Sequence, residues 1–258
     1  VLVVNRCNGV YEEDFTLRTV LVNNTDDLFY YNASTDPYSN GNGGAMLSQN
    51  QTTCDNIIGN ANYDIGHVYS TGGGGVAYLG SLCDNTPTPN NVKAGGVTGQ
   101  SNPVGDPFAI DYVAHEMGHQ FGDNHTFNNT DDGSCSGNGN AATRVEPGSG
   151  TTIMAYAGIC SPSNVQSNSD DYFHAFSVQE TATEVMSTGG NCFTTIPFVN
   201  QPPVAGDVPN YTIPKSTPFV LTATATDADN DPMTYCWEQT NTGSATGPPT
   251  STSTSACN

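Results

Sequence analysis

The sequence predicts an α/β domain followed by a short all-β segment. Before residue 197 the chain mixes helix-like and strand-like patterns, whereas every apolar stretch after the three prolines of residues 197–203 resembles a strand. The clearest helix signal, at Asp106, lies in the first part, and the clearest turn between strand-like stretches, at residues 229–232, lies in the second. We therefore expect one domain over residues 1–197, followed by a linker and a partial or truncated β-sandwich over residues 198–258.

The charge balance limits the classes of partner. The chain has 258 residues with 5 Lys and Arg against 25 Asp and Glu, a formal net charge of -20. Nucleic acid is excluded as a partner, because its affinity for proteins depends on clustered Lys and Arg. No apolar run approaches the roughly 18 residues that span a bilayer, so we expect no membrane partner. Residues 1–4 lack the basic region and long apolar stretch of a signal peptide, and we expect a processed or trimmed chain.

The cysteines indicate an oxidising, extracellular setting. Their number is even, eight, and no two are spaced as C-x-x-C. Connectivity does not follow from spacing. On proximity in sequence we expect the pairs Cys54–Cys83, Cys135–Cys160 and Cys236–Cys257, which leaves Cys7 for Cys192.

The N-terminal part carries weak signals of several elements. Residues 5–14 are compatible with a helix. Residues 15–21 and 28–31 have the composition of two strands, and a turn rich in Asn and Asp separates them. We expect a helix and then a pair of strands.

A run of four glycines, residues 72–75, separates two further strand candidates at 65–69 and 76–79. No Lys-Ser or Lys-Thr follows the glycines, and their spacing does not match GxGxxG. We interpret them as a flexible approach to a strand and not as a phosphate-binding loop.

The strongest helix signal begins at Asp106-Pro107. Asp can cap the first turn, and Pro at the first helical position loses no hydrogen bond. An apolar face at helical spacing follows, formed by Phe108, Ile110, Tyr112, Val113 and Met117. We expect the helix to end near Gln120 or Phe121, where Gly122 can adopt the left-handed conformation of a C-terminal cap.

The second part contains a predicted hairpin over residues 218–237. Val220, Thr222, Thr224 and Thr226 alternate along a strand, residues 229–232 form a turn, and residues 233–237 resume the strand-like pattern. This pattern is typical of an immunoglobulin-like sandwich. Only about 60 residues remain for it, and residues 240–255 are rich in Ser, Thr, Gly and Pro, so we expect a small or truncated unit.

Residues 115–125 read HEMGHQFGDNH and carry the chemistry. His115 and His119 lie one helical turn apart, so both imidazoles leave the same face and can share one metal ion. Glu116 is displaced around the helix towards the water of that metal, where it serves as a base. Gly122 lets the chain turn back and bring His125 as a third ligand. Three protein ligands leave one position open, as in a catalytic zinc site.

The bland alternative is that each histidine is an ordinary core or surface residue. Three of the five histidines lie in this one window of eleven residues. Such a combination arises by chance with a probability on the order of 10⁻⁵. The spacing therefore favours a metal site.

The motif HEMGHQFGDNH, followed by Ile153-Met154-Ala155-Tyr156, resembles the extended zinc signature and Met-turn of the metzincin metallopeptidases. Within that clan, the chain resembles the secreted bacterial reprolysin-like (adamalysin-related, M12B-type) proteases. Further local similarity comes from TGGGGVAYLGSLC at 71–83, GSGTTIMAYAGIC at 148–160 and DYFHAFSVQE at 171–180. One departure is Thr126 after the third ligand, where adamalysins usually have Asp and astacins Glu.

The resemblance implies a fold and several residue roles. The fold is a twisted mixed sheet with flanking helices, an active-site helix and a Met-turn. Met154 would lie beneath the metal as an apolar floor, and Tyr156 would reach the metal or the transition-state oxyanion, with a packing role as the alternative. The strand Gly75-Val76-Ala77-Tyr78 would bind an extended substrate by strand addition.

Three other candidates have weaker support. His174 lies in an expected C-terminal helix over residues 172–186 that packs under the active site in the family, and we expect a structural role for it and for His67. Asp227, Asp229 and Asp231 have the one-three-five spacing of a calcium loop without its later Gly and Glu. Calcium is therefore a candidate structural ligand, with a solvated turn as the favoured interpretation.

Two functions follow from these observations. The first is a secreted, monomeric zinc endopeptidase that cleaves extended polypeptides with a zinc-activated water and Glu116 as general base. The alternative is a non-catalytic cell-surface adhesion module with a vestigial zinc site. Retention of Glu116 argues against the alternative, since a vestigial site has no use for a base.

Overall fold

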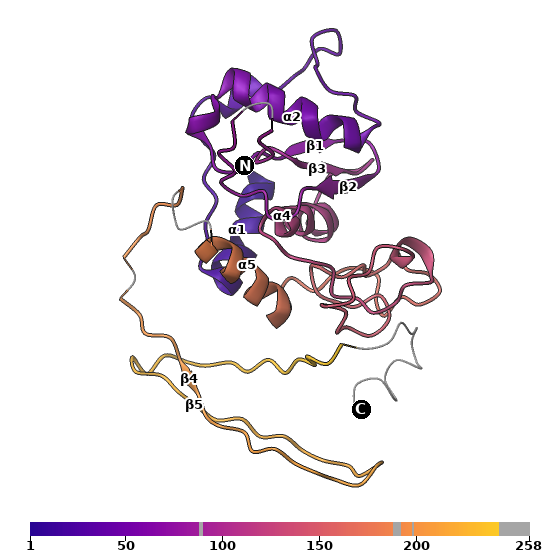
Figure 1. Cartoon of the computed structure of the whole chain (residues 1–258), viewed down its shortest axis with the longest axis vertical. Helices are drawn as coiled ribbons and strands as arrows, with labels where there is room; N and C mark the ends of the chain where they lie inside the picture. Colours follow the sequence, from indigo (N-terminus) through magenta and orange to yellow (C-terminus); the bar gives the residue numbers. More distant parts are fainter. Residues whose placement is uncertain (88–89, 188–191, 198, 243–258) are drawn as a thin grey trace. The chain divides into compact units, whose positions relative to one another are not determined.

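The computed structural model describes residues 1–87, 90–187, 192–197 and 199–242 (Figure 1). Contacts divide it into two compact units. One contains Val1–Phe193, which combines helices with a small mixed sheet, and the other is Thr194–Glu238. The first unit is therefore a mixed α/β body, as predicted.

Three short strands form the sheet of the first unit, in the order β1 (Val68–Ser70), β3 (Gly96–Gly99), β2 (Gly74–Ala77). β3 is central and buried at all four positions, parallel to β1 and antiparallel to β2. Helix α2 (Gly43–Ile57) lies along one face of this sheet, and the helix that carries the histidines packs against the other (Figure 1). Both expected strands exist, each displaced by about two residues.

The helix expected from Asp106 is continuous through three segments. These are α3 (Asp106–Phe108), a π-helical turn η3 (Ala109–Ala114) and α4 (His115–Gln120). The predicted span is confirmed, but the expected N-cap is wrong. Gly105 occupies the cap position, and Asp106 instead accepts hydrogen bonds from Arg6 at 2.9 and 3.1 Å.

Helices α1 (Leu2–Phe15) and α5 (Ala175–Ser187) confirm two further predictions and contribute to the core beneath α4. Tyr11 is fully buried, and its hydroxyl donates to the carbonyl of Ala114 at 2.9 Å. Its ring contacts those of Phe121 and Phe173 at centroid distances of 5.2 Å. This aromatic cluster fixes the helix that presents the histidines to the apolar interior.

The two strands expected at 15–21 and 28–31 are absent from the described chain. In the first segment Phe15 ends α1 and Thr16 is left-handed with φ of 56°, and the Asn8 side-chain oxygen accepts from the backbone N–H and hydroxyl of Thr19 at 2.8 and 2.7 Å. The second overlaps a short 3-10 helix, η1 (Thr25–Leu28), after Asn24, which adopts a left-handed conformation with φ of 66°. Side-chain hydrogen bonds thus replace strand pairing.

Helix α2 and strand β3 were not anticipated. Only Met46 and Leu47 supply large buried apolar side chains to α2, and the helix also buries amides that meet the sheet. Asn50 donates to the carbonyl of Ala94 at 2.7 Å, and Gln51 accepts from the N–H of Ala94 at 2.8 Å. These hydrogen bonds join residues that are 43 or 44 positions apart. Because polar side chains make the contact, the sequence lacks the apolar periodicity that would predict these elements.

The disulfide predictions are partly wrong. Cys135–Cys160 is present as predicted, whereas Cys83 pairs with Cys192 across 109 residues. Cys54–Cys83 and Cys7–Cys192 are therefore excluded, and Cys7 and Cys54 are buried thiols. Burial suits a free thiol, which packs as a small apolar group. The expected pair Cys236–Cys257 involves a residue outside the described part of the chain.

The second unit contains one pair of short strands, β4 (Val204–Ala205) and β5 (Ala225–Thr226), which are antiparallel. The predicted turn exists, because the Asp227 side chain accepts from the N–H groups of Asp229 and Asp231 at 2.9 and 3.0 Å. The predicted partner strand at 233–237 does not form. An immunoglobulin-like sandwich stays a prediction. Within the described residues, no helix has the length and apolarity to cross a membrane.

Candidate metal centre

Three histidines converge at the C-terminal half of the long helix. His115 and His119 lie on α4, and His125 follows it after one turn. The Nε2 atom of His125 lies 3.2 Å from Nε2 of His115 and 3.0 Å from Nε2 of His119. The three predicted ligands are therefore together, with nitrogens facing one another.

A glycine cap reverses the chain between the second and third histidines. Gly122 has φ of 97°, its N–H donates to the carbonyl of His119 at 2.9 Å, and the N–H of Asp123 donates to the carbonyl of Gly118 at 2.9 Å. These two bonds define a Schellman motif. The predicted role of Gly122 is confirmed.

Helix α5 holds the reversed chain in place. The buried Asp123 side chain accepts from the Thr181 hydroxyl at 2.7 Å. Asn124 donates twice to the Glu180 carboxylate, from its backbone N–H at 2.8 Å and from its amide at 2.7 Å. Since Asn124 directly precedes His125, α5 sets the direction in which the third histidine approaches.

The donor set fits a divalent cation. Each Nδ1 faces a backbone carbonyl: that of Ile153 for His115 and of Asp123 for His119, both at 2.7 Å, and of Asn138 for His125 at 2.6 Å. A carbonyl only accepts, so each Nδ1 carries the proton and each Nε2 presents a lone pair. Three lone pairs facing one another repel unless a cation lies between them. This arrangement, with carbonyls orienting imidazole ligands, is that of protein zinc sites.

Burial keeps these imidazoles neutral. It lowers the pKa of His115 well below its usual value, with the other two histidines adding to the effect. The pKa of His119 is lowered and that of His125 falls to about 3, in both cases chiefly through desolvation. Neutral imidazole is the form that binds metal.

Glu116 lies beside the histidine cluster and reaches towards β2. Its side chain is buried, and a Cβ placed on Gly75 would come within 2.2 Å of Oε1. Only a glycine at position 75 leaves room for this carboxylate. Burial raises the pKa of Glu116 to about 8, a direction that a neighbouring cation would oppose.

Met154 and Tyr156 lie on the chain that passes beneath α4. Met154 is fully buried, and its sulfur would be 2.5 Å from a Cβ placed on Gly118, between the two helical histidines. The Tyr156 ring contacts those of His125 and Phe127 at 4.6 Å. Burial raises the pKa of Tyr156 to about 12, with the charge of Glu116 adding to the effect, so its hydroxyl stays protonated.

β2 is an edge strand next to this cluster. Gly75 pairs with Thr98 of β3, and Tyr78, beyond the strand, donates its N–H to the carbonyl of Gly95 at 2.9 Å. A pocket of about 540 Å³ opens beside the histidines; its lining comprises Ala77, Leu79, His119, Asn124, His125 and residues 138–141.

The other two histidines have structural surroundings. His67, the residue before β1, lies between Gln120 of α4 and Thr98 of β3, at 2.7 and 2.8 Å, and so connects these two elements. His174 is buried and directly precedes α5, not within the helix as expected, and its Nδ1 accepts from the N–H of Phe176 at 3.1 Å. Neither belongs to the metal cluster.

Several functional groups have no signature in the sequence. The carbonyl oxygens that orient the histidines belong to Ile153, Asp123 and Asn138, and backbone atoms leave no residue signature. Glu146 is a buried carboxylate that accepts a hydrogen bond from Thr126, the residue after His125, and it belongs to no sequence motif. Only folding brings these groups to the site.

The three aspartates of the second unit form another acidic cluster. Oxygens of Asp227, Asp229 and Asp231 lie within 4.8 Å of one another. Two backbone N–H groups already bind the Asp227 carboxylate, as in a solvated turn. Calcium at this turn stays a prediction.

Comparison with known proteins assigns the family. Residues 1–184 match the family described as metallo-peptidase family M12B, reprolysin-like. No curated protein matches the chain. The chain belongs to the reprolysin-like M12B metallopeptidases, and the family together with the three histidines indicates zinc as the metal.

Proposed function

We propose that the chain is a secreted zinc endopeptidase that hydrolyses peptide bonds of extended polypeptides. The observation that carries the proposal is the convergence of three Nε2 lone pairs with one adjoining buried carboxylate. The family assignment supports the reaction class.

His115, His119 and His125 would hold the ion. A bound zinc ion would polarise the scissile carbonyl and lower the pKa of a water molecule. Glu116 accepts the proton of the attacking water and delivers it to the leaving amine. Burial raises the pKa of Glu116 and a bound cation would lower it, so these two opposing effects together set the pKa of the base.

Two residues beneath the helix would assist. The protonated hydroxyl of Tyr156 donates to the oxyanion that develops on the substrate. Met154 supplies a buried apolar floor under the helical histidines and does not bind the metal.

The edge strand offers a substrate site. An extended peptide adds to β2 along Gly75, Val76, Ala77 and Tyr78, and main-chain hydrogen bonds hold it above Glu116. Two disulfides and the family support an extracellular location. We further propose a monomer, with residues 1–197 as the catalytic domain and residues 198–258 as an appended β segment.

The test separates this enzyme from an adhesion module with a vestigial site. Glu116→Gln removes the base but keeps the size of the side chain, so we expect cleavage of fluorescent casein to fall by at least about 10²-fold while one zinc per chain stays bound. Cleavage by the unaltered chain should stop with 1,10-phenanthroline and return with added zinc. Substantial turnover by Glu116→Gln would reject the role of Glu116, and no cleavage by the zinc-loaded chain would favour the adhesion module.

A further inference from the structure

Glu146 is a buried carboxylate that the proposed reaction does not use. It has no ion-pair partner among the described residues. Its stabilisation comes from neutral donors, because Oε1 accepts from the N–H groups of Thr151 and Thr152 at 2.9 and 3.0 Å. Oε2 accepts from the hydroxyls of Thr152, at 2.6 Å, and Thr126. A buried charge with so many donors is fixed in position.

These donors belong to two separate segments of the chain. Thr126 directly follows His125, whereas Thr151 and Thr152 lead into the turn that contains Met154. The backbone adds to the connection, because the N–H of Glu146 donates to the carbonyl of Thr126 at 2.9 Å. Glu146 therefore adds its side-chain contacts to a direct backbone attachment between the two segments, in which the N–H of Thr126 donates to the carbonyl of Met154 at 3.2 Å.

Gly150 allows the turn to wrap around this carboxylate. Its φ is 67°, and a Cβ placed on it would lie 3.1 Å from the Glu146 carboxyl carbon. The chain thus adopts a conformation that other residues resist in order to bring two N–H groups onto one oxygen.

His125 needs such support more than its partners do. The helix backbone fixes the relative positions of His115 and His119, whereas His125 lies outside the helix. Its ring nitrogen Nδ1 bonds to the carbonyl of Asn138, and its backbone carbonyl accepts from the Thr143 hydroxyl at 2.7 Å. The next residue, Thr126, is attached to Glu146.

We propose that Glu146 is a positioning residue for the third histidine ligand, acting through Thr126. The proposal rests on the proposed metal site. The Glu146 carboxylate holds the His125 segment against the Met154 turn, so that Nε2 of His125 lies close to the Nε2 atoms of His115 and His119. Losing such an outer contact typically weakens metal binding about 10- to 100-fold.

The experiment measures zinc affinity by chelator competition and the visible spectrum of the cobalt-substituted chain. Glu146→Leu removes every acceptor, and we expect the zinc dissociation constant to rise about 10- to 100-fold, with a shifted cobalt spectrum. Thr126→Val removes one hydroxyl at constant size, and we expect a rise of about 3- to 10-fold. Since both act through one contact, the double variant should bind no more weakly than Glu146→Leu.

A carboxylate and threonine pair elsewhere in the chain, less buried than Glu146 and Thr126, provides the control. Asp84 accepts from the N–H and hydroxyl of Thr86 at 2.9 and 2.5 Å and from the N–H of Val92 at 2.8 Å, so it connects a loop in the same way. Asp84→Leu and Thr86→Val should lower the melting temperature without altering zinc affinity or the cobalt spectrum.

The outcomes separate this inference from the proposed function. Wild-type zinc affinity in folded Glu146→Leu and Thr126→Val would overturn the role of Glu146. If Glu146→Leu does not fold, Thr126→Val and its control Thr86→Val decide. If the unaltered chain binds zinc but cleaves nothing, the proposed peptidase is rejected, and the zinc affinities of the variants alone decide the role of Glu146. If the unaltered chain binds no zinc, both proposals are rejected.

Discussion

Gly75 occupies two roles at once in the candidate site. It lies on the strand proposed to bind substrate, and it leaves the space that the Glu116 carboxylate fills. A side chain at this position would therefore act on the base and not on the metal. A substitution at Gly75 therefore tests whether the position of the Glu116 carboxylate matters for catalysis.

Gly75→Ala should impair catalysis without removing zinc. The added Cβ would lie 2.2 Å from Oε1 of Glu116 and 2.4 Å from its carboxyl carbon, so the carboxylate must move. A displacement of about 1 Å can cost about 10²-fold, and we expect a loss of that order in kcat/KM. Gly73→Ala is the control, because its Cβ would meet no atom within 4 Å. Equal activity of the two variants would contradict the assigned position of Glu116.

At the scale of residues, the sequence predicted those site residues that lie on one helix or at its end. His115, His119 and Glu116 are fixed by helical geometry, and Gly122 indicated the reversal that brings His125. Glu146 lies 20 residues beyond Thr126, with no periodic relation to it. Contacts that depend on how two loops meet cannot be inferred from spacing.

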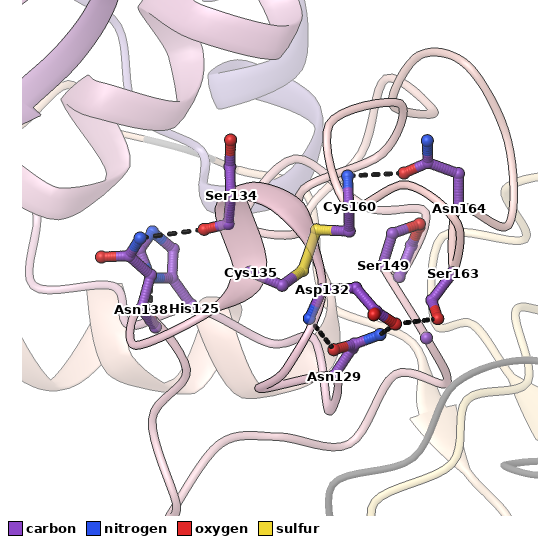
Figure 2. Close-up of a disulfide and its surroundings, with 12 residues drawn as sticks. His125, Asn129, Asp132, Ser134, Cys135, Asn138, Ser149, Cys160, Ser163 and Asn164 are labelled. Atoms are coloured by element: carbon purple, nitrogen blue, oxygen red, sulfur yellow. Dashed lines mark hydrogen bonds between the residues drawn. A yellow bond between two sulfur atoms is a disulfide. The ribbon is translucent and has the colours of Figure 1, made fainter.

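At the scale of elements, the Cys135–Cys160 disulfide supports the turn that orients the third histidine (Figure 2). Cys135 ends the short helix η4 (Gly133–Cys135), and its carbonyl accepts from the N–H of Asn138 at 3.1 Å. The Asn138 side chain donates to the carbonyl of Ser134 at 2.9 Å, and its own carbonyl faces Nδ1 of His125. The disulfide therefore connects to the metal site through one turn.

Replacing both cysteines, Cys135→Ala with Cys160→Ala, should lower stability and zinc affinity together. A cross-link over 25 residues stabilises by about 3–4 kcal/mol through the unfolded chain. The freed turn should also raise the zinc dissociation constant. The control pair Cys83→Ala with Cys192→Ala should lower the melting temperature and leave zinc affinity unchanged. Calorimetry and chelator competition measure the two effects, and equal zinc affinity in both double variants would refute the connection.

Element prediction succeeded where one segment determined its own structure. The ends of the long helix came from Pro107 and Gly122, which act locally. Helix α2 and strand β3 depend instead on each other, since amides of α2 bind the backbone of Ala94, just before β3. β3 also contains Gly96, where a Cβ would lie 2.1 Å from Oε1 of Gln120. Close packing requires glycine at this position, although glycine has a low propensity for strands.

At the scale of the whole molecule, net charge governs encounter with substrate. The chain carries 25 acidic against 5 basic residues, a net charge of -20. Such a charge creates a long-range potential that attracts cationic and repels anionic partners. In the proposed peptidase it should influence capture of the substrate and leave the chemical step unchanged.

Cleavage of basic peptides should therefore depend on ionic strength. Consider two fluorogenic peptides with one scissile sequence, flanked by lysines or by glutamates. Raising salt from 0.01 M to 0.1 M shortens the screening length from about 30 Å to about 10 Å. We expect kcat/KM for the lysine peptide to fall about 10-fold, that for the glutamate peptide to rise, and kcat at saturation to change little. A ratio of the two kcat/KM values that stays constant with salt would mean that the charges surrounding the site cancel locally, despite the excess carried by the chain.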